Sequence, residues 1–369
     1  MTGNKIFVFS ISIIIIIIGL ELLTKSLFFI LDRDIKAYKY YPDRYKKSKD
    51  LGYELTPDWE LDHYNLHEKF NSSGFRSPEI DQKKPDNNYR IIITGSSIVY
   101  GRTSNSYTIS HLLEKKLNKV YGKTKKIEVI NAGVPGYNTF HILKQFQTKL
   151  EQFSPDLIIH YQFFTDLSII DFGNEFSLKG YIFNPNNATS IKDNLKSFID
   201  KSYLLTMVKV AYGISSNNRN NQQFQSIAKD FKVKNSSEII INKQYEIYQQ
   251  LNFFKQNLDL LANECNKIDA DLILCIPISL YKPFNTPDEI NLIDNYDSKD
   301  FILNSIGTGK NIIKEISTVN SNTFYFDISK NIKSDISLFD DKYHPLEKGN
   351  NIISEELKNY IVRNKFIKN

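Results

Sequence analysis

Short apolar runs that alternate with helical patterns constrain the fold of this chain more than any other feature. The run Arg90-Ile91-Ile92-Ile93-Thr94 is rich in β-branched residues, which is typical of a buried strand. The expected strands are Ile91 to Gly95, Ile127 to Ala132, Leu157 to Tyr161, Leu272 to Ile278 and Phe324 to Ile328. The expected helices are Thr108 to Tyr121, Thr139 to Phe153, Lys243 to Asn266, Lys310 to Ser317 and Glu347 to Arg363. This alternation predicts the α/β class: a flavodoxin-like three-layer α/β/α sandwich with a five-stranded parallel sheet.

An apolar segment near the N-terminus predicts a membrane-spanning helix. Residues Ile6 to Leu20 are almost wholly apolar and include six consecutive isoleucines. At about 1.5 Å per residue this run is too short for a hydrocarbon core of ~30 Å, so we expect the helix to continue to about Leu31. A cleavable signal peptide is the alternative, because its apolar stretch has a similar length. No alanine precedes Ala37, so the small-residue cleavage pattern is missing and an uncleaved anchor is favoured.

The charges around this segment predict its orientation. The amino terminus and Lys5 precede the apolar run, so the positive-inside rule places the N-terminus in the cytoplasm. Lys25, Arg33 and Lys36 on the far flank oppose this orientation. We expect a single-pass membrane protein whose N-terminal helix contacts the lipid bilayer and whose main domain is extracytoplasmic.

The length of 369 residues suits one main domain with an insertion. We expect a membrane anchor at 1–31, a juxtamembrane spacer at 32–88 and the main domain at 89–369. The spacer is rich in Tyr, Lys and Pro without a sustained period, so we expect it to be irregular. Between about 167 and 242 the alternation breaks, and Ser215 to Gln225 is a polar run. Since this insertion follows the third strand, it is expected to form a lid or substrate wall, or a surface loop.

Composition argues against several kinds of partner. The net charge of +5 comes from charges of both signs without a long basic tract, so no nucleic-acid partner is expected. Cys265 and Cys275 are the only cysteines and are expected to be buried thiols, although a disulfide between them stays open. His63 and His67 lie four apart, a spacing that could place two metal ligands on one helix face, but no further ligands accompany them. We therefore expect neither a metal nor a cofactor.

Two polar segments at the ends of the predicted sheet carry the chemistry. Ser97 follows the first strand, at the edge where side chains of a parallel sheet reach a crevice. Asp341 precedes His344 by three residues, so one loop can present a carboxylate and an imidazole to one nucleophile. These residues predict a catalytic triad in which Ser97 attacks, His344 takes its proton and Asp341 orients the imidazole. The alternatives are a plain Gly-Ser-Ser turn and a surface histidine, with Asp340 as the neighbour that could be mistaken for the acid.

Four blocks together resemble the SGNH or GDSL hydrolase superfamily. Its Gly-Asp-Ser start, glycine block, Gly-x-Asn-Asp block and terminal Asp-x-x-His correspond to Gly95-Ser96-Ser97, Asn131 to Gly136, Phe163 to Asp166 and Asp341 to His344. Phe70 to Arg76 also looks like the Asn-x-x-Gly-Phe-Arg lead-in of membrane-anchored bacterial members. The resemblance covers about residues 65 to 166 and 320 to 362. Two positions depart from it, because Ser96 replaces the usual Asp and Thr165 replaces the usual Asn.

The resemblance implies an esterase that removes a short acyl group, such as acetyl, through a serine ester intermediate. Its substrate would be an extracytoplasmic acylated small molecule or polysaccharide, with carbohydrate esters favoured. The oxyanion would be held by the backbone N–H groups of Ser97 and Gly136 and by the hydroxyl of Thr165. Two alternatives remain: an O-acyltransferase that uses the same triad, and a catalytically weak scaffold in cell-surface polysaccharide assembly, which the altered residues Ser96 and Thr165 motivate.

Overall fold

The computed structural model describes residues 3–30, 44–63, 66–167, 202–205, 208, 236–293 and 299–368. The chain divides into two compact units. One comprises Met1–Asp43 and Asn184–Ile241, and the other comprises Arg44–Phe183 and Asn242–Asn369. The second unit contains the sheet and is the part that positions the candidate site.

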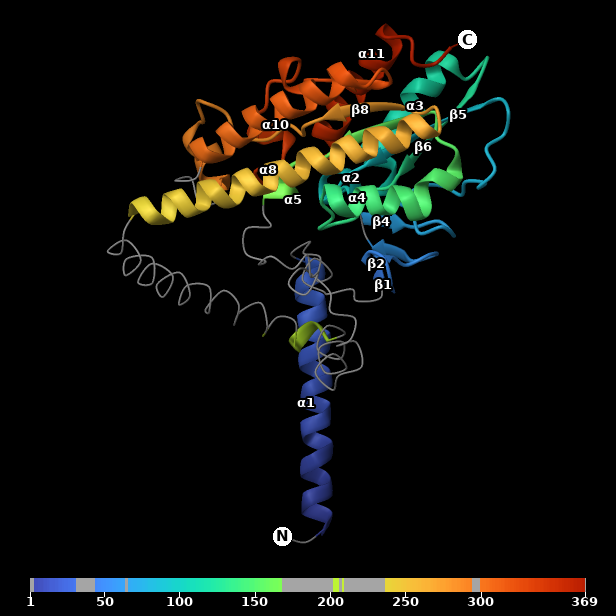
Figure 1. Cartoon of the computed structure of the whole chain (residues 1–369). Helices are drawn as coiled ribbons and strands as arrows, with labels where there is room; N and C mark the ends of the chain where they lie inside the picture. Colours follow the sequence, from blue (N-terminus) through green and yellow to red (C-terminus); the bar gives the residue numbers. More distant parts are fainter. Residues whose placement is uncertain are drawn as a thin grey trace. The chain divides into compact units, whose positions relative to one another are not determined.

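A five-stranded parallel sheet forms the centre of the second unit (Figure 1). Its strands are β5 (Asn88–Thr94), β6 (Lys126–Asn131), β7 (Leu157–Tyr161), β8 (Asp271–Cys275) and β9 (Thr323–Tyr325). Their spatial order is β6-β5-β7-β8-β9, and Ile92 of β5 pairs with Ile130 on one side and Ile158 on the other. Both faces of β5 are covered, because Ile91, Ile92 and Ile93 are completely buried. The predicted α/β fold with a flavodoxin-like strand order is confirmed.

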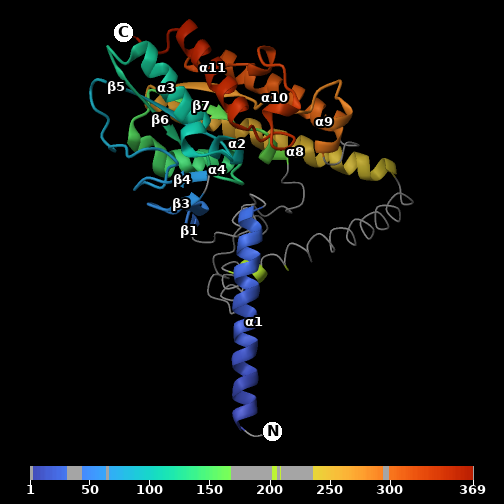
Figure 2. The ribbon, with the colours of Figure 1, turned by 180° about the vertical axis from the view of Figure 1, so that it is seen from behind.

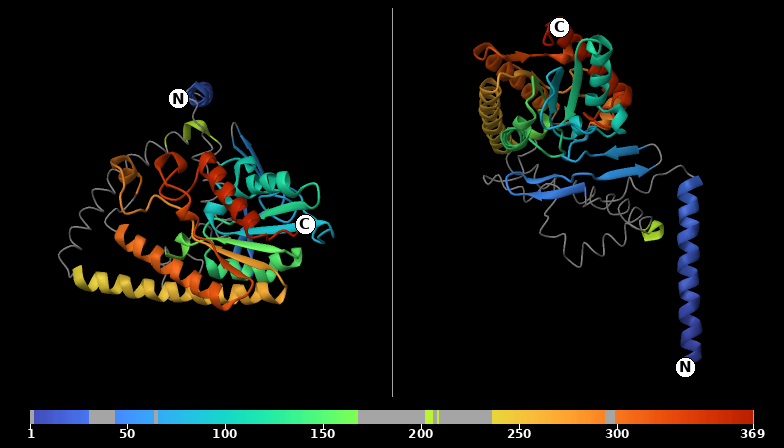
Figure 3. Two further views of the ribbon diagram at one scale, coloured as in Figure 1. Left: turned by 90° about the horizontal axis from the view of Figure 1, so that it is seen from above. Right: turned by 90° about the vertical axis from the view of Figure 1, so that its right-hand side faces the viewer.

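Helices cover both faces of this sheet and complete the three layers (Figure 3). On one face α3 (Ile109–Tyr121) packs against α11 (Glu347–Arg363), as Figure 2 shows from behind. The other face carries α4 (Thr139–Gln145), α8 (Ser236–Lys267) and α10 (Lys299–Val319). Contacts join these three helices, since Gln147 just after α4 donates to Glu264 of α8, and Lys255 of α8 pairs with Glu315 of α10 at 2.6 Å.

Several element boundaries differ from the prediction for identifiable reasons. Strand β8 ends at Cys275 rather than Ile278, because Pro277 has no N–H to donate to a ladder. Helix α10 begins at Lys299 rather than Lys310 and passes through Gly309. A Cβ at Gly309 would lie 2.4 Å from Cε2 of Phe163, so this glycine serves close packing and does not end the helix. The segment predicted as one helix from Thr139 to Phe153 continues beyond α4 as a π turn and a 3₁₀ turn.

The expectation of an irregular spacer is wrong for residues 44–69. These residues form two antiparallel hairpins, β1 (Tyr45–Ser48) with β2 (Gly52–Leu55), and β3 (Glu60–His63) with β4 (Leu66–Lys69). Strands of four residues are too short to show an alternating pattern, which explains why the sequence did not reveal them. Phe70 and Phe75, which follow the second hairpin, are buried, so this segment belongs to the core of the second unit.

In the first unit, the described residues near the N-terminus form the long helix α1 (Gly3–Ile30). Its window Phe9–Ser26 has a mean hydropathy of 1.9, and most of its apolar side chains are exposed, Ile15 by 63%. The helix is long and apolar enough to cross a membrane, a test that a signal sequence would also pass. Within the same unit, the carboxylate of Glu21 accepts hydrogen bonds from Ser202 Oγ at 2.6 Å and from the backbone N–H of Tyr203 at 2.6 Å. Apart from residues 167, 202–205, 208 and 236–242, the predicted insertion at 167–242 lies outside the described residues.

Candidate active site

Ser97 lies at the carboxyl edge of the sheet, on a turn that two glycines allow. Strand β5 ends at Thr94, and Ser97 is the first residue of the short helix α2 (Ser97–Tyr100). A Cβ at Gly95 would lie 2.4 Å from Cγ2 of Val99, and a Cβ at Gly133 would lie 2.3 Å from the backbone nitrogen of Tyr100. Both glycines are therefore required for α2 to pack this closely on the strand ends. This close packing fixes the backbone position from which the side chain of Ser97 extends.

The structure brings Ser97 together with the two residues predicted near the C-terminus. Ser97 Oγ lies 2.7 Å from His344 Nε2, and His344 Nδ1 lies 2.7 Å from Asp341 Oδ2. The histidine is 5% exposed, and the Asp341 side chain is 32% exposed. A hydroxyl, an imidazole and a carboxylate from opposite ends of the chain thus form one continuous hydrogen-bonded series.

Hydrogen bonds within the loop that carries His344 stabilise its conformation. Asp341 Oδ1 accepts from the backbone N–H of Tyr343 at 3.0 Å and of His344 at 2.9 Å. Burial raises the pKa of Asp341, but the hydrogen bonds from the imidazole and from these N–H groups outweigh it, so its pKa lies below the ordinary range. Because an ionised carboxylate can only accept, Nδ1 of His344 carries the proton and Nε2 accepts from Ser97. This is the tautomer that a general base for the serine hydroxyl requires.

The backbone donors predicted for an oxyanion lie on two tight segments. Gly136 has a φ of +85°, a conformation that favours glycine. Within the described part of the chain, no acceptor pairs with the N–H of Ser97 or the N–H of Gly136. Tyr53 of β2 donates its hydroxyl to the carbonyl of Pro135 at 2.6 Å, and so braces the turn that holds Gly136.

Thr165, the third predicted donor, is half-buried in the short helix α5 (Phe164–Leu167). Its neighbour Asp166 accepts from the backbone N–H of Thr139 at 3.0 Å and from Thr139 Oγ1 at 2.7 Å. Burial raises the pKa of Asp166 to about 6, although these hydrogen bonds act in the opposite direction. Since Thr139 begins α4 just after Gly136, Asp166 ties the segment of Thr165 to the segment of Gly136.

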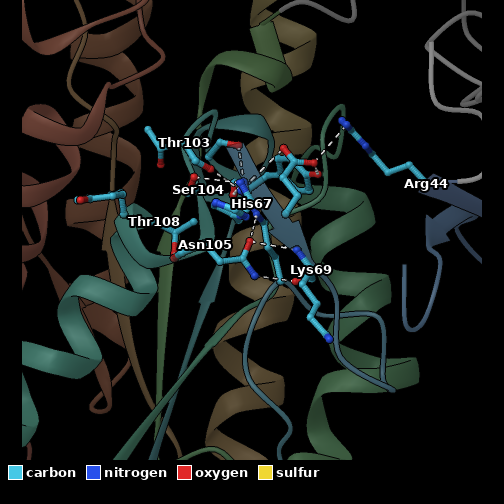
Figure 4. Close-up of polar contacts among 12 residues, drawn as sticks. Arg44, His67, Lys69, Thr103, Ser104, Asn105 and Thr108 are labelled. Atoms are coloured by element: carbon cyan, nitrogen blue, oxygen red, sulfur yellow. Dashed lines mark hydrogen bonds and ion pairs between the residues drawn. The ribbon is translucent and has the colours of Figure 1, made fainter. Parts of the chain in front are cut away.

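A buried arginine that the sequence analysis did not single out holds the segment after Ser97. The guanidinium of Arg76 donates through Nη1 to the carbonyls of Tyr100 at 2.8 Å and Gly101 at 2.7 Å, and through Nη2 to the carbonyl of Thr103. Its Nε donates to Oδ1 of Asn105 at 2.8 Å, and Asn105 in turn binds the backbone of Lys69 (Figure 4). Arg76 is the last residue of the Asn-x-x-Gly-Phe-Arg segment, and this motif is the one sequence feature that could have pointed to it.

Negative charge for this arginine comes from a buried carboxylate in the second hairpin. Glu68 of β4 lies 3.8 Å from Arg76 and 3.2 Å from Arg44, whose position Figure 4 shows. The hydroxyl of Tyr100 also donates to Glu68 at 2.9 Å. A buried ion pair with these additional hydrogen bonds is costly to break, because removing one partner leaves the other charge buried and unpaired. The hairpins therefore brace the Ser97 segment rather than serving only as a spacer.

A second arginine links the two halves of the site. Arg102, in the loop after α2, places Nη1 2.6 Å from Asp340 Oδ2 and 3.0 Å from Asp341 Oδ2. Asp340, the neighbour that could be mistaken for the acid, thus contacts Arg102 while Asp341 contacts the imidazole. Nothing in the sequence distinguished Arg102 from other surface arginines.

Aromatic side chains flank the imidazole. The ring of Tyr343 lies 4.6 Å from the ring of His344, between centroids, and stacks on Phe164 at 5.0 Å with an interplanar angle of 10°. Tyr281, from the loop after β8, lies 6.4 Å from Phe164. Tyr343 is half-buried, so its ring forms part of the surface beside His344, and Tyr281 is half-buried next to Phe164.

The structure also places the two cysteines and the histidines at positions 63 and 67. Cys265 and Cys275 are free, buried thiols, as expected, and burial raises the pKa of both. His63 and His67 lie on two paired strands rather than on one helix face. Among the described residues, no group of three or more His, Cys, Asp or Glu side chains could hold a metal ion.

Comparisons with known proteins give distant structural likenesses. No family model and no curated protein matches the sequence. A GDSL-like lipase from Bacteroides thetaiotaomicron is 11% identical with a TM-score of 0.41, over 77% of this chain and 93% of its own. An acetyl xylan esterase is 13% identical with a TM-score of 0.41, over 74% and 99%. A lipase/acylhydrolase from Enterococcus faecalis is 14% identical with a TM-score of 0.42, over 75% and 96%. At these values the likenesses carry no conclusion about activity, which has to come from the site itself.

Proposed function

We propose that this protein is a serine esterase that removes a short acyl group, such as acetyl, from an alcohol. The observation that carries the proposal is the series Ser97, His344 and Asp341, with 2.7 Å at each of its two side-chain contacts. A serine hydroxyl is a weak nucleophile unless a base takes its proton during attack. His344 has the right atom in contact, and Asp341 stabilises the imidazolium that forms.

The reaction proceeds in two halves at these three residues. Ser97 Oγ attacks the acyl carbon while His344 Nε2 takes the hydroxyl proton, and the carbonyl oxygen becomes an oxyanion. The N–H groups of Ser97 and Gly136, assisted by Thr165, hold that oxyanion. Collapse breaks the ester bond, and His344 returns its proton to the leaving alcohol. Water, deprotonated by His344, then attacks the acyl-serine and releases the carboxylic acid and the free Ser97.

The surroundings of His344 favour a carbohydrate as the alcohol. The leaving oxygen takes its proton from Nε2, so groups that flank the imidazole also flank the alcohol. Tyr343 presents an aromatic ring there, 4.6 Å from the imidazole between centroids, while Arg102 and Asp340 at the nearby surface are 44% and 46% exposed and can bond hydroxyl groups. A sugar ring has one apolar face and a hydroxyl-bearing edge, which suits this combination.

The proposed location follows from α1. With α1 as an uncleaved anchor in the bilayer and the N-terminus in the cytoplasm, the esterase unit would be extracytoplasmic. Acylated cell-surface or extracellular polysaccharides would then be within its reach.

A fluorophosphonate probe tests the nucleophile. The full chain in detergent micelles is incubated with the probe, beside Ser97→Ala and beside Ser96→Ala as a matched control at the adjacent serine. We expect labelling of the wild type and of Ser96→Ala, and none of Ser97→Ala, together with loss of acetate release from 4-nitrophenyl acetate. Labelling of Ser97→Ala as strongly as the wild type, or of neither, would remove the nucleophile and leave the scaffold alternative.

The same acyl-serine can pass its acyl group to a second alcohol. Because acylation and deacylation use the same positions in reverse, the aromatic surface that holds the leaving alcohol also suits an acceptor sugar. Acetate release from an acetylated xylo-oligosaccharide, measured with and without a non-acetylated acceptor, separates the two outcomes. Hydrolysis predicts unchanged acetate release, whereas a transferase predicts less acetate and an acylated acceptor.

A further inference from the structure

Arg102 and His344 share one oxygen atom of Asp341. Asp341 Oδ2 accepts from His344 Nδ1 at 2.7 Å and lies 3.0 Å from Nη1 of Arg102. The same Nη1 donates to Asp340 Oδ2 at 2.6 Å. Arg102 lies in the loop that follows Ser97, and Asp340 and Asp341 lie in the loop that carries His344. The guanidinium of Arg102 therefore connects these two loops through two neighbouring carboxylates.

The backbone that carries Arg102 is itself fixed by a buried side chain. Arg76, whose side chain is completely buried, donates to the carbonyls of Tyr100 and Gly101 before Arg102 and of Thr103 after it. Gly101 has a φ of +87°, so the chain turns immediately before Arg102. On the other side of this loop, Asn350 of α11 donates to the carbonyl of Tyr107 at 2.9 Å. The backbone at Arg102 is therefore held in place, which restricts the directions in which its side chain can extend.

We propose that Arg102 is a positioning residue for the catalytic pair: it holds Asp341 against His344 by pairing with the carboxylate oxygen that accepts from the imidazole. The proposal rests on the proposed function of the triad. A guanidinium that pairs with two neighbouring carboxylates restricts the side-chain rotamers of both. Asp341 Oδ2 is thereby kept within hydrogen-bond reach of His344 Nδ1.

Solvent access limits the strength of this contact. Because the Arg102 side chain is 44% exposed, its ion pairs are screened, and we expect its removal to reduce activity without abolishing it.

NMR of the Nδ1 proton of His344 tests the proposal without requiring activity. The full chain in detergent micelles is labelled with ¹⁵N-histidine, and the His344 signals among the six histidines are assigned with His344→Gln. In Arg102→Ala we expect the Nδ1 proton to exchange faster with water, because Asp341 is held less firmly against it. Arg102→Lys keeps the charge and is expected to restore the exchange rate of the wild type.

The kinetic counterpart is the pair of constants kcat and KM for 4-nitrophenyl acetate at one fixed pH. We expect kcat of Arg102→Ala to fall about tenfold with KM unchanged, and Arg102→Lys to restore it. Arg363→Ala, which removes an exposed arginine on α11, is the control and should change neither readout. An exchange rate of the Nδ1 proton in Arg102→Ala equal to that of the wild type would overturn the role of Arg102. If Ser97→Ala retains the probe label, the proposed function fails instead, whatever the exchange rates show.

Discussion

The two halves of the candidate site are held in different ways. The Ser97 half is fixed by close contact, since Gly95 and Gly133 let α2 pack on the strand ends and the buried Arg76 holds the following carbonyls. The Asp341 half is a surface loop fixed by hydrogen bonds and ion pairs, with its carboxylates 32% and 46% exposed. The comparison teaches that close packing determines the position of Ser97, whereas charged groups determine the position of the loop that carries His344. Changes of volume should therefore damage the first half, and changes of charge the second.

The largest expected effect comes from a change of charge that leaves shape intact. Asp341→Asn keeps the size of the side chain but removes the acceptor that selects the Nδ1–H tautomer of His344. We expect kcat to fall by on the order of 10⁴-fold with little loss of stability. Steady-state kinetics on 4-nitrophenyl acetate and thermal unfolding measure the two effects. Asp340→Asn is the matched control at the adjacent carboxylate and should cost about tenfold or less; equal losses in both variants would show that Asp341 has no special role.

A change of volume on the other half should act through stability. In Gly133→Ala the new Cβ would lie 2.3 Å from the nitrogen of Tyr100 and 2.8 Å from the carbonyl carbon of Val99. Because both atoms belong to backbone, α2 must shift, and we expect a loss of about 3 kcal/mol in the free energy of unfolding.

Gly307→Ala provides the contrast for this prediction. Nothing lies within 4 Å of a Cβ at Gly307, which is inside α10, so alanine should be neutral or stabilise by up to about 1 kcal/mol. Chemical denaturation of both variants measures the difference. If Gly133→Ala lowers the free energy of unfolding no more than Gly307→Ala does, the Ser97 half is not held by close packing.

The sheet was predictable because its strands are buried on both faces. Short β-branched runs such as Ile91 to Ile93, bounded by polar residues, are typical of strands buried on both faces, and all three side chains are completely buried. The hairpins at 44–69 were not predictable, because four-residue strands carry little periodicity. The beginning of α10 was missed since Gly307 and Gly309 look like helix ends in sequence, while only the fold shows that Phe163 requires Gly309.

The site shows the same division between local and long-range signals. The pair Asp341 and His344 is local, because three residues separate its members, and the sequence sufficed to propose it. Its contact with Ser97 spans most of the chain and depends on the parallel sheet that brings both ends to one edge. Arg102 had no signal, since an ion pair between an exposed arginine and a distant loop leaves no pattern in one sequence.

The smallest expected effect concerns the oxyanion and tests whether backbone donors suffice. The N–H groups of Ser97 and Gly136 belong to segments fixed by packing, whereas Thr165 adds a side-chain hydroxyl from α5. A carboxamide reaches further than a hydroxyl and offers two donor hydrogens. Thr165→Asn is therefore expected to raise kcat about tenfold, less than the 10²- to 10³-fold that a full donor is typically worth. Thr165→Val, which keeps the shape and removes the hydroxyl, is the matched variant and should lower kcat. If neither substitution changes the rate, position 165 contributes nothing, and the oxyanion is held by the rigid, backbone-built half of the site alone.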